Sequence, residues 1–317
     1  MPVKILVTGA NGFVGRALCA HLQQQGCEVY AAVRTPWAGL HANRIVTIKG
    51  LEQKTDWSAA LDEIDVVVHL AARVHVMHDT SADPEMEFRK ANVDATLHLA
   101  RQAVKAGAKR MVFLSSVKAN GESTAPGQPF KESDVPNPQD AYGRSKWEAE
   151  MGLLQIAHET RLEVVIVRSP LVYGPGVKAN FASLMRLVAH AWPLPLGEIH
   201  NRRSLVGLGN LVDFLATCVA HPHAANQTFL VSDGQDMSTT ELVRAIAQAA
   251  HVPARLLPVP VRVLLWVGSI LGQGAAMHRL CDNLQLDISK AKTLLKWMPP
   301  NTISLELERA YQGTQKP

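Results

Sequence analysis

The pair Tyr142 and Lys146 is well suited to chemistry, because its spacing of four places a phenol and an ammonium on one helical face. A nearby ammonium stabilises a phenolate and is expected to lower the pKa of Tyr142, which could then exchange a proton with a carbonyl or an alcohol. Ser116 follows the apolar run Met111–Ser115, a predicted strand, and its hydroxyl could reach the same oxygen. The three residues indicate proton transfer at a carbonyl or alcohol oxygen.

A glycine-rich segment, Thr8–Gly15, follows the first predicted strand and opens the first predicted helix, with the spacing GxxGxxG. Glycines let the backbone turn tightly and approach a pyrophosphate, whose charge is met by free N–H groups and the helix dipole. The segment therefore predicts a dinucleotide-binding loop rather than a purely structural turn. The residues expected to contact the dinucleotide here are Gly9, Asn11, Gly12, Phe13, Val14 and Gly15.

The second predicted strand, Glu28–Arg34, ends without the acidic residue that would accept hydrogen bonds from an adenosine ribose. Arg34 offers a guanidinium fork that suits a 2′-phosphate, so NADP(H) is favoured over NAD(H). NAD(H) stays possible if Arg34 is only a solvated residue at the end of a strand.

Short β-branched runs alternate with helical periodicity over residues 1–170, which predicts parallel strands joined by helical crossovers. The strands are apolar on both faces, as in a sheet covered by helices on each side. We expect an α/β fold with a doubly wound parallel sheet and a dinucleotide-binding domain at 1–170, with returns near 204–212 and 228–233. Residues 171–317 are more helical and are expected to form a smaller, mainly helical substrate-binding domain.

The net charge of +4, from 32 basic and 28 acidic residues, is small, and the basic residues are scattered. This pattern argues against a nucleic-acid surface but suits a small anionic ligand. The four cysteines form no CxxC pair, which indicates a reducing compartment and neither a disulfide framework nor a thiolate zinc site. His75 and His78 have no third ligand candidate, so no metal is expected.

The first residues run directly into a strand pattern, which leaves no room for a signal peptide and favours a cytoplasmic protein. The apolar stretch Val261–Met277 is interrupted by Arg262 and Gln273 and is too short for a membrane span. A buried helix is favoured there over an interfacial anchor.

The motifs resemble, in combination, those of extended short-chain dehydrogenases/reductases of the nucleotide-sugar epimerase/dehydratase/reductase group. They are the three loop glycines, Ser116, Tyr142xxxLys146 and the segment Arg168–Gly174. The resemblance covers nearly the whole chain. It implies an NAD(P)-dependent enzyme with a Rossmann-type sheet, and a homodimer formed through two helices of each subunit.

By this resemblance Ser116 and Tyr142 bind the reacting oxygen, and Lys146 holds the nicotinamide ribose. Pro170 is expected near the nicotinamide. Asn92 would hold a water or a main-chain group behind the lysine. His69 is interpreted as a hydrogen-bonded strand residue rather than a catalyst. The further cofactor contacts that the resemblance implies are Leu70, Ala71, Ala72 and Ser115.

The substrate residues that the resemblance implies fall in the order seen in UDP-sugar enzymes. Asn180 and Arg203 correspond to diphosphate contacts, Leu196 to the uracil region, and Arg279 and Asp282 to the diphosphate and ribose region. Two arginines that converge on a diphosphate would form charge-assisted, bidentate hydrogen bonds. Each residue could also be an ordinary surface position.

Val117 and Lys118 stand where dehydratases of this group place an Asp-Glu pair, so dehydration is not expected. Reduction of the 4-keto group of a UDP-6-deoxy-N-acetylhexosamine, for surface polysaccharide synthesis, is favoured because Arg34 suits an exchangeable cofactor. A UDP-sugar 4-epimerase is the main alternative. A reductase of small carbonyl compounds and a non-catalytic dinucleotide sensor are the other two.

Overall fold

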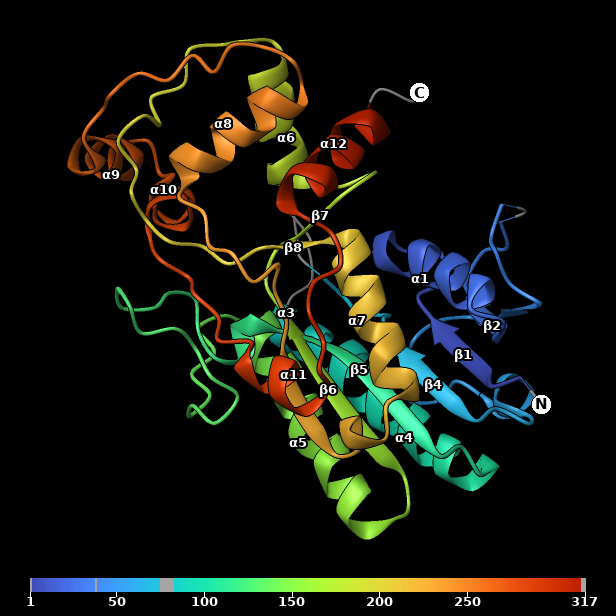
Figure 1. Cartoon of the computed structure of the whole chain (residues 1–317). Helices are drawn as coiled ribbons and strands as arrows, with labels where there is room; N and C mark the ends of the chain where they lie inside the picture. The colour runs from blue at the N-terminus through green and yellow to red at the C-terminus, as the bar shows by residue number, and fades with distance from the viewer. Residues whose placement is uncertain (1, 38, 75–82, 315–317) are drawn as a thin grey trace.

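A parallel sheet of seven strands, in the order β3-β2-β1-β4-β5-β6-β9, forms the centre of the computed structural model (Figure 1), which describes residues 2–37, 39–74 and 83–314. Two short strands pair separately, β7 with β8. This arrangement confirms the predicted doubly wound α/β fold. The strands are β1 (Lys4–Thr8), β2 (Glu28–Val33), β3 (Arg44–Thr47), β4 (Val66–His69), β5 (Arg110–Ser116), β6 (Glu163–Ser169), β7 (Val172–Tyr173), β8 (Val206–Gly207) and β9 (Gln227–Leu230).

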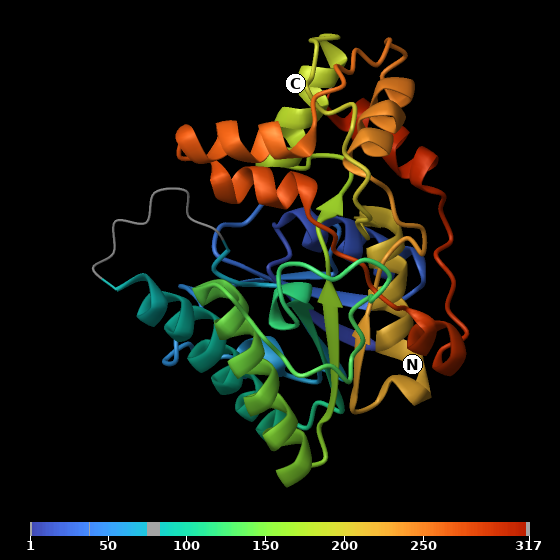
Figure 2. The same ribbon diagram turned by 90° about the vertical axis from the view of Figure 1, so that its left-hand side faces the viewer.

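Helices cover both faces of the main sheet, with α4 and α5 on one side and α7 on the other (Figure 2). The helices are α1 (Phe13–Gln24), α2 (Ser58–Leu61), α3 (Pro84–Arg89), α4 (Ala95–Ala106), α5 (Ala141–Glu159), α6 (Ala179–Ala189), α7 (Leu208–Ala220), α8 (Thr239–Ala249), α9 (Val261–Ile270), α10 (Gly274–Cys281), α11 (Ser289–Leu294) and α12 (Ile303–Thr314). A π-helical turn η1 (Lys90–Asp94) precedes α4, and short 3₁₀ turns η2 (Val117–Ala119) and η3 (Pro222–Ala224) follow β5 and α7.

The alternation of side chains along β1 explains the two apolar layers. Ile5 and Val7 pack with α1 and α7, whereas Leu6 between them packs with the helices of the opposite face. All three side chains are fully buried. From β1 the chain runs outward through β2 and β3 and then crosses to β4, so the strand order reverses between β1 and β4. Ligands of open α/β sheets bind at the carboxyl end of such a reversal.

The C-terminal half of the chain contributes both to a separate helical cluster and to the main sheet. A third apolar cluster joins α6, α8 and α12, whereas β9 pairs with β6, and α7 packs beside α1. The segment near 204–212 was expected to return to the main sheet. Its strand, Val206–Gly207, pairs with β7 instead. Only the following helix, α7, packs on the main sheet. The division of function at residue 170 stays a prediction.

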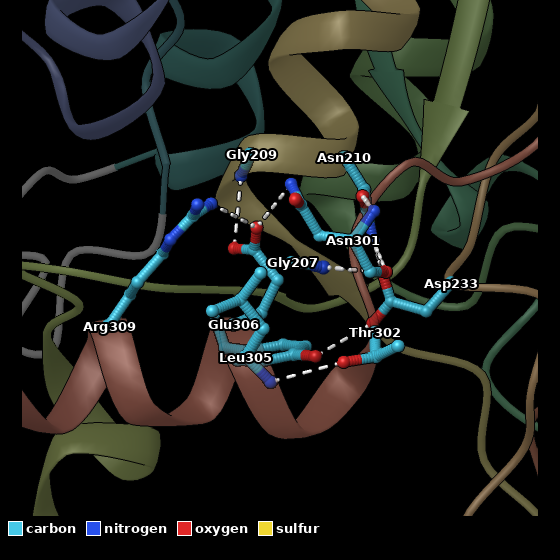
Figure 3. Close-up of polar contacts among 10 residues, drawn as sticks. Gly207, Gly209, Asn210, Asp233, Asn301, Thr302, Leu305, Glu306 and Arg309 are labelled. Carbon is cyan, nitrogen blue, oxygen red and sulfur yellow. Dashed lines mark hydrogen bonds and ion pairs between the residues drawn. The ribbon is translucent and has the colours of Figure 1, made fainter.

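A buried polar network fastens α12 to α7 (Figure 3). Glu306 is 1% exposed and accepts hydrogen bonds from the backbone N–H of Gly209 at 3.1 Å and from Asn301 Nδ2 at 2.9 Å. Its carboxylate therefore lies at the positive N-terminal end of α7. Beside it Asp233 accepts a 2.7 Å hydrogen bond from Asn210, and burial raises the pKa of Asp233.

The segment expected to be a buried helix at 261–277 forms two helices, α9 and α10, and the expectation of burial is wrong for both, since no residue of α10 is buried. Only Leu264 and Gly268 of α9 are buried, while Trp266 is 65% exposed. An apolar stripe has the same sequence pattern whether it faces a core or solvent, so the period could not decide this. Among the described residues, no helix is long and apolar enough to cross a membrane.

Candidate active site

The glycine loop lies between β1 and α1, and its close backbone contacts are possible only because glycine has no side chain. Gly9 has a φ of +69°, and a Cβ there would lie 2.8 Å from the backbone nitrogen of Ala71. Gly15 packs against the backbone of Ala10, which a Cβ would meet at 2.7 Å. Gly12 begins α1 without a side-chain cap, with its N–H bonded to the Gly9 carbonyl at 2.8 Å. Phe13 and Val14 form the first turn, so backbone donors lie at the loop surface.

The loop after β4 lies against the glycine loop, and it contains Leu70, Ala71 and Ala72. The backbone N–H of Leu70 donates to the Thr8 carbonyl at 3.3 Å. Below this contact His69 bonds Thr8 Oγ1 through Nδ1 at 2.6 Å and Thr96 Oγ1 through Nε2 at 2.9 Å. Burial, assisted by the charge of Lys146, lowers the pKa of His69 to about 3. His69 is therefore a neutral, hydrogen-bonded strand residue.

The end of β5 and the start of α5 bring Ser116, Tyr142 and Lys146 together. The side chain of Asp140 caps α5 through the N–H of Gly143 at 2.7 Å, which fixes where the helix begins. Ser116 hydrogen-bonds Tyr142, and Lys146 Nζ donates to the Leu114 carbonyl at 2.8 Å.

The pKa of Tyr142 differs from the expectation. Burial, followed by the charge of Asp140, raises the pKa of Tyr142 to about 12, although the hydrogen bond from Ser116 lowers it. Burial also lowers the pKa of Lys146 to about 7, against the opposing effect of Glu150. The expected lowering of the pKa of Tyr142 by Lys146 is wrong, because burial is the largest effect on the tyrosine and raises its pKa. The tyrosine holds its proton, and the lysine titrates near neutral pH.

Asn92 lies in the π-helical turn η1, and its side chain bonds the main chain of Arg73. Its Oδ1 accepts from the N–H of Arg73 at 2.7 Å, and its Nδ2 donates to the Arg73 carbonyl and to Ser145 Oγ, both at 3.0 Å. Ser145 in turn donates to the Tyr142 carbonyl at 2.8 Å. Asn92 thus connects the loop after β4 to the helix that carries Tyr142.

A buried ion pair beneath the site escaped the sequence analysis. Arg168 Nη2 lies 2.6 Å from Glu150 Oε2, and the two residues are 5% and 2% exposed. Ser115 Oγ donates to the other carboxylate oxygen at 2.5 Å, and Arg168 Nη1 donates to Asn120 at 3.0 Å. The hydroxyl of Ser115 is thus committed to Glu150. Glu150 follows Lys146 by one helical turn, and that spacing is the one signal that could have found it.

Two arginines, Arg16 and Arg34, lie near the glycine loop, one in α1 and one after β2. Arg34 is exposed directly after β2. Arg16, in the first turn of α1, donates from Nε to the Asn11 carbonyl at 2.9 Å, and its guanidinium lies 4.3 Å from the Trp37 ring centre. Asn11 donates to the Thr35 carbonyl at 2.5 Å, while its Oδ1 is buried without a partner among the described residues.

The structure brings together only part of the expected substrate set. Arg203 Nη1 donates to the Asp282 carbonyl at 2.9 Å, and burial lowers the pKa of Arg203. Leu196 is buried in the apolar cluster of α6 and α8. Asn180 is exposed in the first turn of α6, and Arg279 is exposed on α10 with its Nε on the Ala275 carbonyl.

Pro170 is buried directly after β6, at the carboxyl edge of the sheet where the loop and α5 also lie. No group of three His, Cys, Asp or Glu side chains in the described part of the chain could hold a metal. His75 and His78 lie outside the described residues.

The sheet, its glycine loop and the Tyr–Lys helix define a Rossmann-type enzyme. The chain belongs to the NAD dependent epimerase/dehydratase family, whose sequence model matches residues 5–232. It is 46% identical over 314 residues to a UDP-glucose 4-epimerase of Vibrio cholerae, covering 99% of this chain and 96% of that protein. It is accordingly a nucleotide-sugar enzyme of this NAD-dependent family.

Solved structures share the fold over nearly their full length. The structure of MoeE5 in complex with UDP-glucose and NAD has a TM-score of 0.78 at 24% identity and covers 99% of both chains. A UDP-glucuronic acid 4-epimerase of Bacillus cereus, in complex with NAD, has a TM-score of 0.79 at 22% identity and covers 99% of this chain and 97% of its own. These likenesses support the fold assignment.

Proposed function

We propose that the protein is a UDP-hexose 4-epimerase. The 46% identity to the Vibrio cholerae UDP-glucose 4-epimerase, over almost the full length of both proteins, is the observation that carries the proposal. The sequence alone favoured net reduction of a 4-keto sugar. The identity to the Vibrio cholerae protein supports the alternative, a UDP-sugar 4-epimerase, better. A UDP-linked sugar is the proposed substrate, with Arg203 and Arg279 as the candidate partners of its diphosphate.

The glycine loop suits a dinucleotide, because it leads into the start of α1, where backbone N–H groups can meet a pyrophosphate, and Gly9 lets it pack closely against Ala71. The loop backbone would hold the pyrophosphate, and Lys146 the nicotinamide ribose. Asn11 Oδ1, buried without a partner among the described residues, is available as an acceptor. When bound there, the nicotinamide supplies a reversible hydride acceptor.

The protein side of the reaction is proton transfer at the oxygen on C4 of the sugar. We assign Tyr142 to remove and return this proton, and Ser116 to hold the same oxygen by a hydrogen bond. Because Tyr142 holds its own proton, it must first release that proton to solvent before the phenolate can accept the proton of the sugar. Lys146 titrates near neutral pH, so its ammonium can form beside Tyr142 and stabilise this phenolate. Epimerisation requires the 4-keto sugar to turn its other face to the nicotinamide before Tyr142 returns the proton.

The decisive experiment follows UDP-glucose by NMR after addition of the protein and NAD⁺, together with absorbance at 340 nm. Epimerisation gives UDP-galactose with no net change in absorbance. Tyr142→Phe is the matched control, because it keeps the ring and removes only the hydroxyl. No conversion of UDP-glucose or UDP-N-acetylglucosamine by folded, NAD-bound protein would overturn the proposal.

A second candidate is reduction of the 4-keto group of a UDP-6-deoxy-N-acetylhexosamine with NADPH. Arg34 favours it, since β2 is followed by a cation where a ribose-binding acid would favour a retained NAD⁺. The same residue supports a preference for NADP(H), while NAD is the cofactor in the solved structures described above. Stoichiometric oxidation of NADPH by the 4-keto sugar would establish this function in place of epimerisation. The homodimer, the cytoplasmic location and the role in surface polysaccharide synthesis stay predictions.

A further inference from the structure

Helix α9 presents an apolar stripe to solvent. Val263, Trp266, Val267 and Ile270 have the spacing of one helical face, and Trp266 and Ile270 are 65% and 64% exposed. Leu271, directly after the helix, is 67% exposed and extends the stripe. Contiguous exposed apolar residues of this kind mark a site of interaction. Figure 2 shows α9 and α10 side by side, projecting from the upper part of the molecule.

The opposite face of α9 is already packed. Gly268 faces α10, where a Cβ would collide with Met277, and Leu264 is buried. The helix therefore does not need its outer stripe for attachment to the protein. The stripe is a second apolar face, left without a partner within the described chain.

The charged residues of α9 and of the segment that leads into it are all basic. Residues 242–281 include Arg244, Arg255, Arg262 and Arg279 and no aspartate or glutamate. Arg262 lies on α9 itself, and both Arg255 and Arg262 are exposed. Asp282, directly after α10, is the first acidic residue beyond this segment and lies 3.2 Å from His278. An apolar helix face that carries an arginine and no acid is complementary to an anionic partner that has an apolar interior.

We propose that α9 and its flanking arginines dock the protein on the surface of an anionic lipid bilayer. The indole of Trp266 combines an apolar ring with an N–H donor, which suits the headgroup level of a membrane. Valine, isoleucine and leucine side chains would enter the acyl boundary while the arginines contact lipid phosphates. A second copy of the chain is a poorer occupant, because a two-fold contact through this face would bring its arginines together.

The test is co-sedimentation of the full-length protein with vesicles of phosphatidylcholine alone and of phosphatidylcholine with phosphatidylglycerol. We expect binding to the anionic vesicles, weakened by salt. Trp266→Gln with Ile270→Gln should lower the partition coefficient by about tenfold or more, which is roughly 1.4 kcal/mol. Arg262→Gln should lower it about fivefold on the anionic vesicles alone.

Met298→Gln is the matched control, because Met298 is 62% exposed but lies outside the α9–α10 segment. It should leave vesicle binding unchanged. Absence of binding to anionic vesicles, or an equal loss in the Met298 variant, would overturn the proposal. So would a dimer in light scattering that Trp266→Gln converts to a monomer, because the stripe would then be a subunit interface.

The readout is independent of the reaction. Trp266, Ile270 and Arg262 are outside the residues assigned to cofactor or sugar, so turnover of a soluble UDP-sugar should be the same in these variants. A protein that binds vesicles but does not epimerise refutes the proposed function alone. A protein that epimerises but does not bind anionic vesicles refutes the docking alone.

Discussion

Replacement of Glu150 by glutamine tests whether the buried pair with Arg168 supports the active site. Three hydrogen bonds from Arg168 and one from Ser115 end on the Glu150 carboxylate. Removal of one member of a buried pair leaves an uncompensated charge and costs about 3 to 5 kcal/mol. Because the amide oxygen of glutamine still accepts a hydrogen bond, we expect a loss near about 3 kcal/mol. Urea unfolding, with the midpoint and slope both fitted, measures this loss.

Glu148→Gln is the control on the same helix. Glu148 lies 3.4 Å from Arg89 with 38% of its side chain exposed, and such surface pairs contribute about 0 to 1 kcal/mol. Equal losses in the two variants, or a loss under about 1 kcal/mol for Glu150→Gln, would refute the role given to the buried pair.

The same variant should also move the titration of Lys146. Glu150 raises the pKa of Lys146, against the larger opposing effect of burial. Without this negative charge the lysine should lose its proton at a lower pH than the wild-type value of about 7. A ¹³C NMR titration of the lysine side chains, with Lys146→Arg used to assign the resonance, follows this change. An unshifted titration would show that Glu150 does not act on Lys146.

Tyr142→Phe should lower turnover by about 10²-fold or more while NADH affinity is kept, as checked by steady-state kinetics and cofactor titration, and unchanged turnover would reassign the proton donor. Arg34→Ala should narrow the ratio of the binding affinities for NADPH over NADH, measured by cofactor titration, since a charge-assisted contact contributes about 1.5 to 3 kcal/mol. Equal affinities of the wild type for NADPH and NADH would contradict that. The pKa of Lys146 is depressed to about 7 by folding, so the unfolded chain binds more protons above pH 7, and this residue makes stability rise from pH 7 towards 10. Lys146→Met should flatten that rise in thermal unfolding of the cofactor-free protein, and an identical pH profile would contradict the assignment.

The sheet and the glycine loop could be predicted because their signals are local. Buried parallel strands read as β-branched runs, and the loop between Thr8 and Gly15 is set by glycines that no other residue could replace there. The proximity of Ser116 to Tyr142 followed from the rule that strand ends and the next crossover meet at one edge.

Other features depend on contacts that no local pattern encodes. The pKa of Tyr142 is set by burial, which arises only when β5, α5 and their neighbours are assembled. Arg168 meets Glu150 across 18 positions of the sequence, and neither residue type predicts burial. The exposure of Trp266 on α9 could not be predicted from the spacing of the apolar residues. This spacing is the same whether the apolar face of a helix lies against the core or in solvent.

The late position of β9 and α12 in the chain has a consequence for synthesis on the ribosome. β9 covers the open edge of β6, and Glu306 caps α7 only after nearly all residues have been joined. Until then the emerging chain exposes an unpaired strand edge, which is a template for association with other chains. The N-terminal half of the sheet therefore lacks its last strand while the rest of the chain is still being made. Truncations near the C-terminus should yield aggregated protein rather than a working N-terminal fragment.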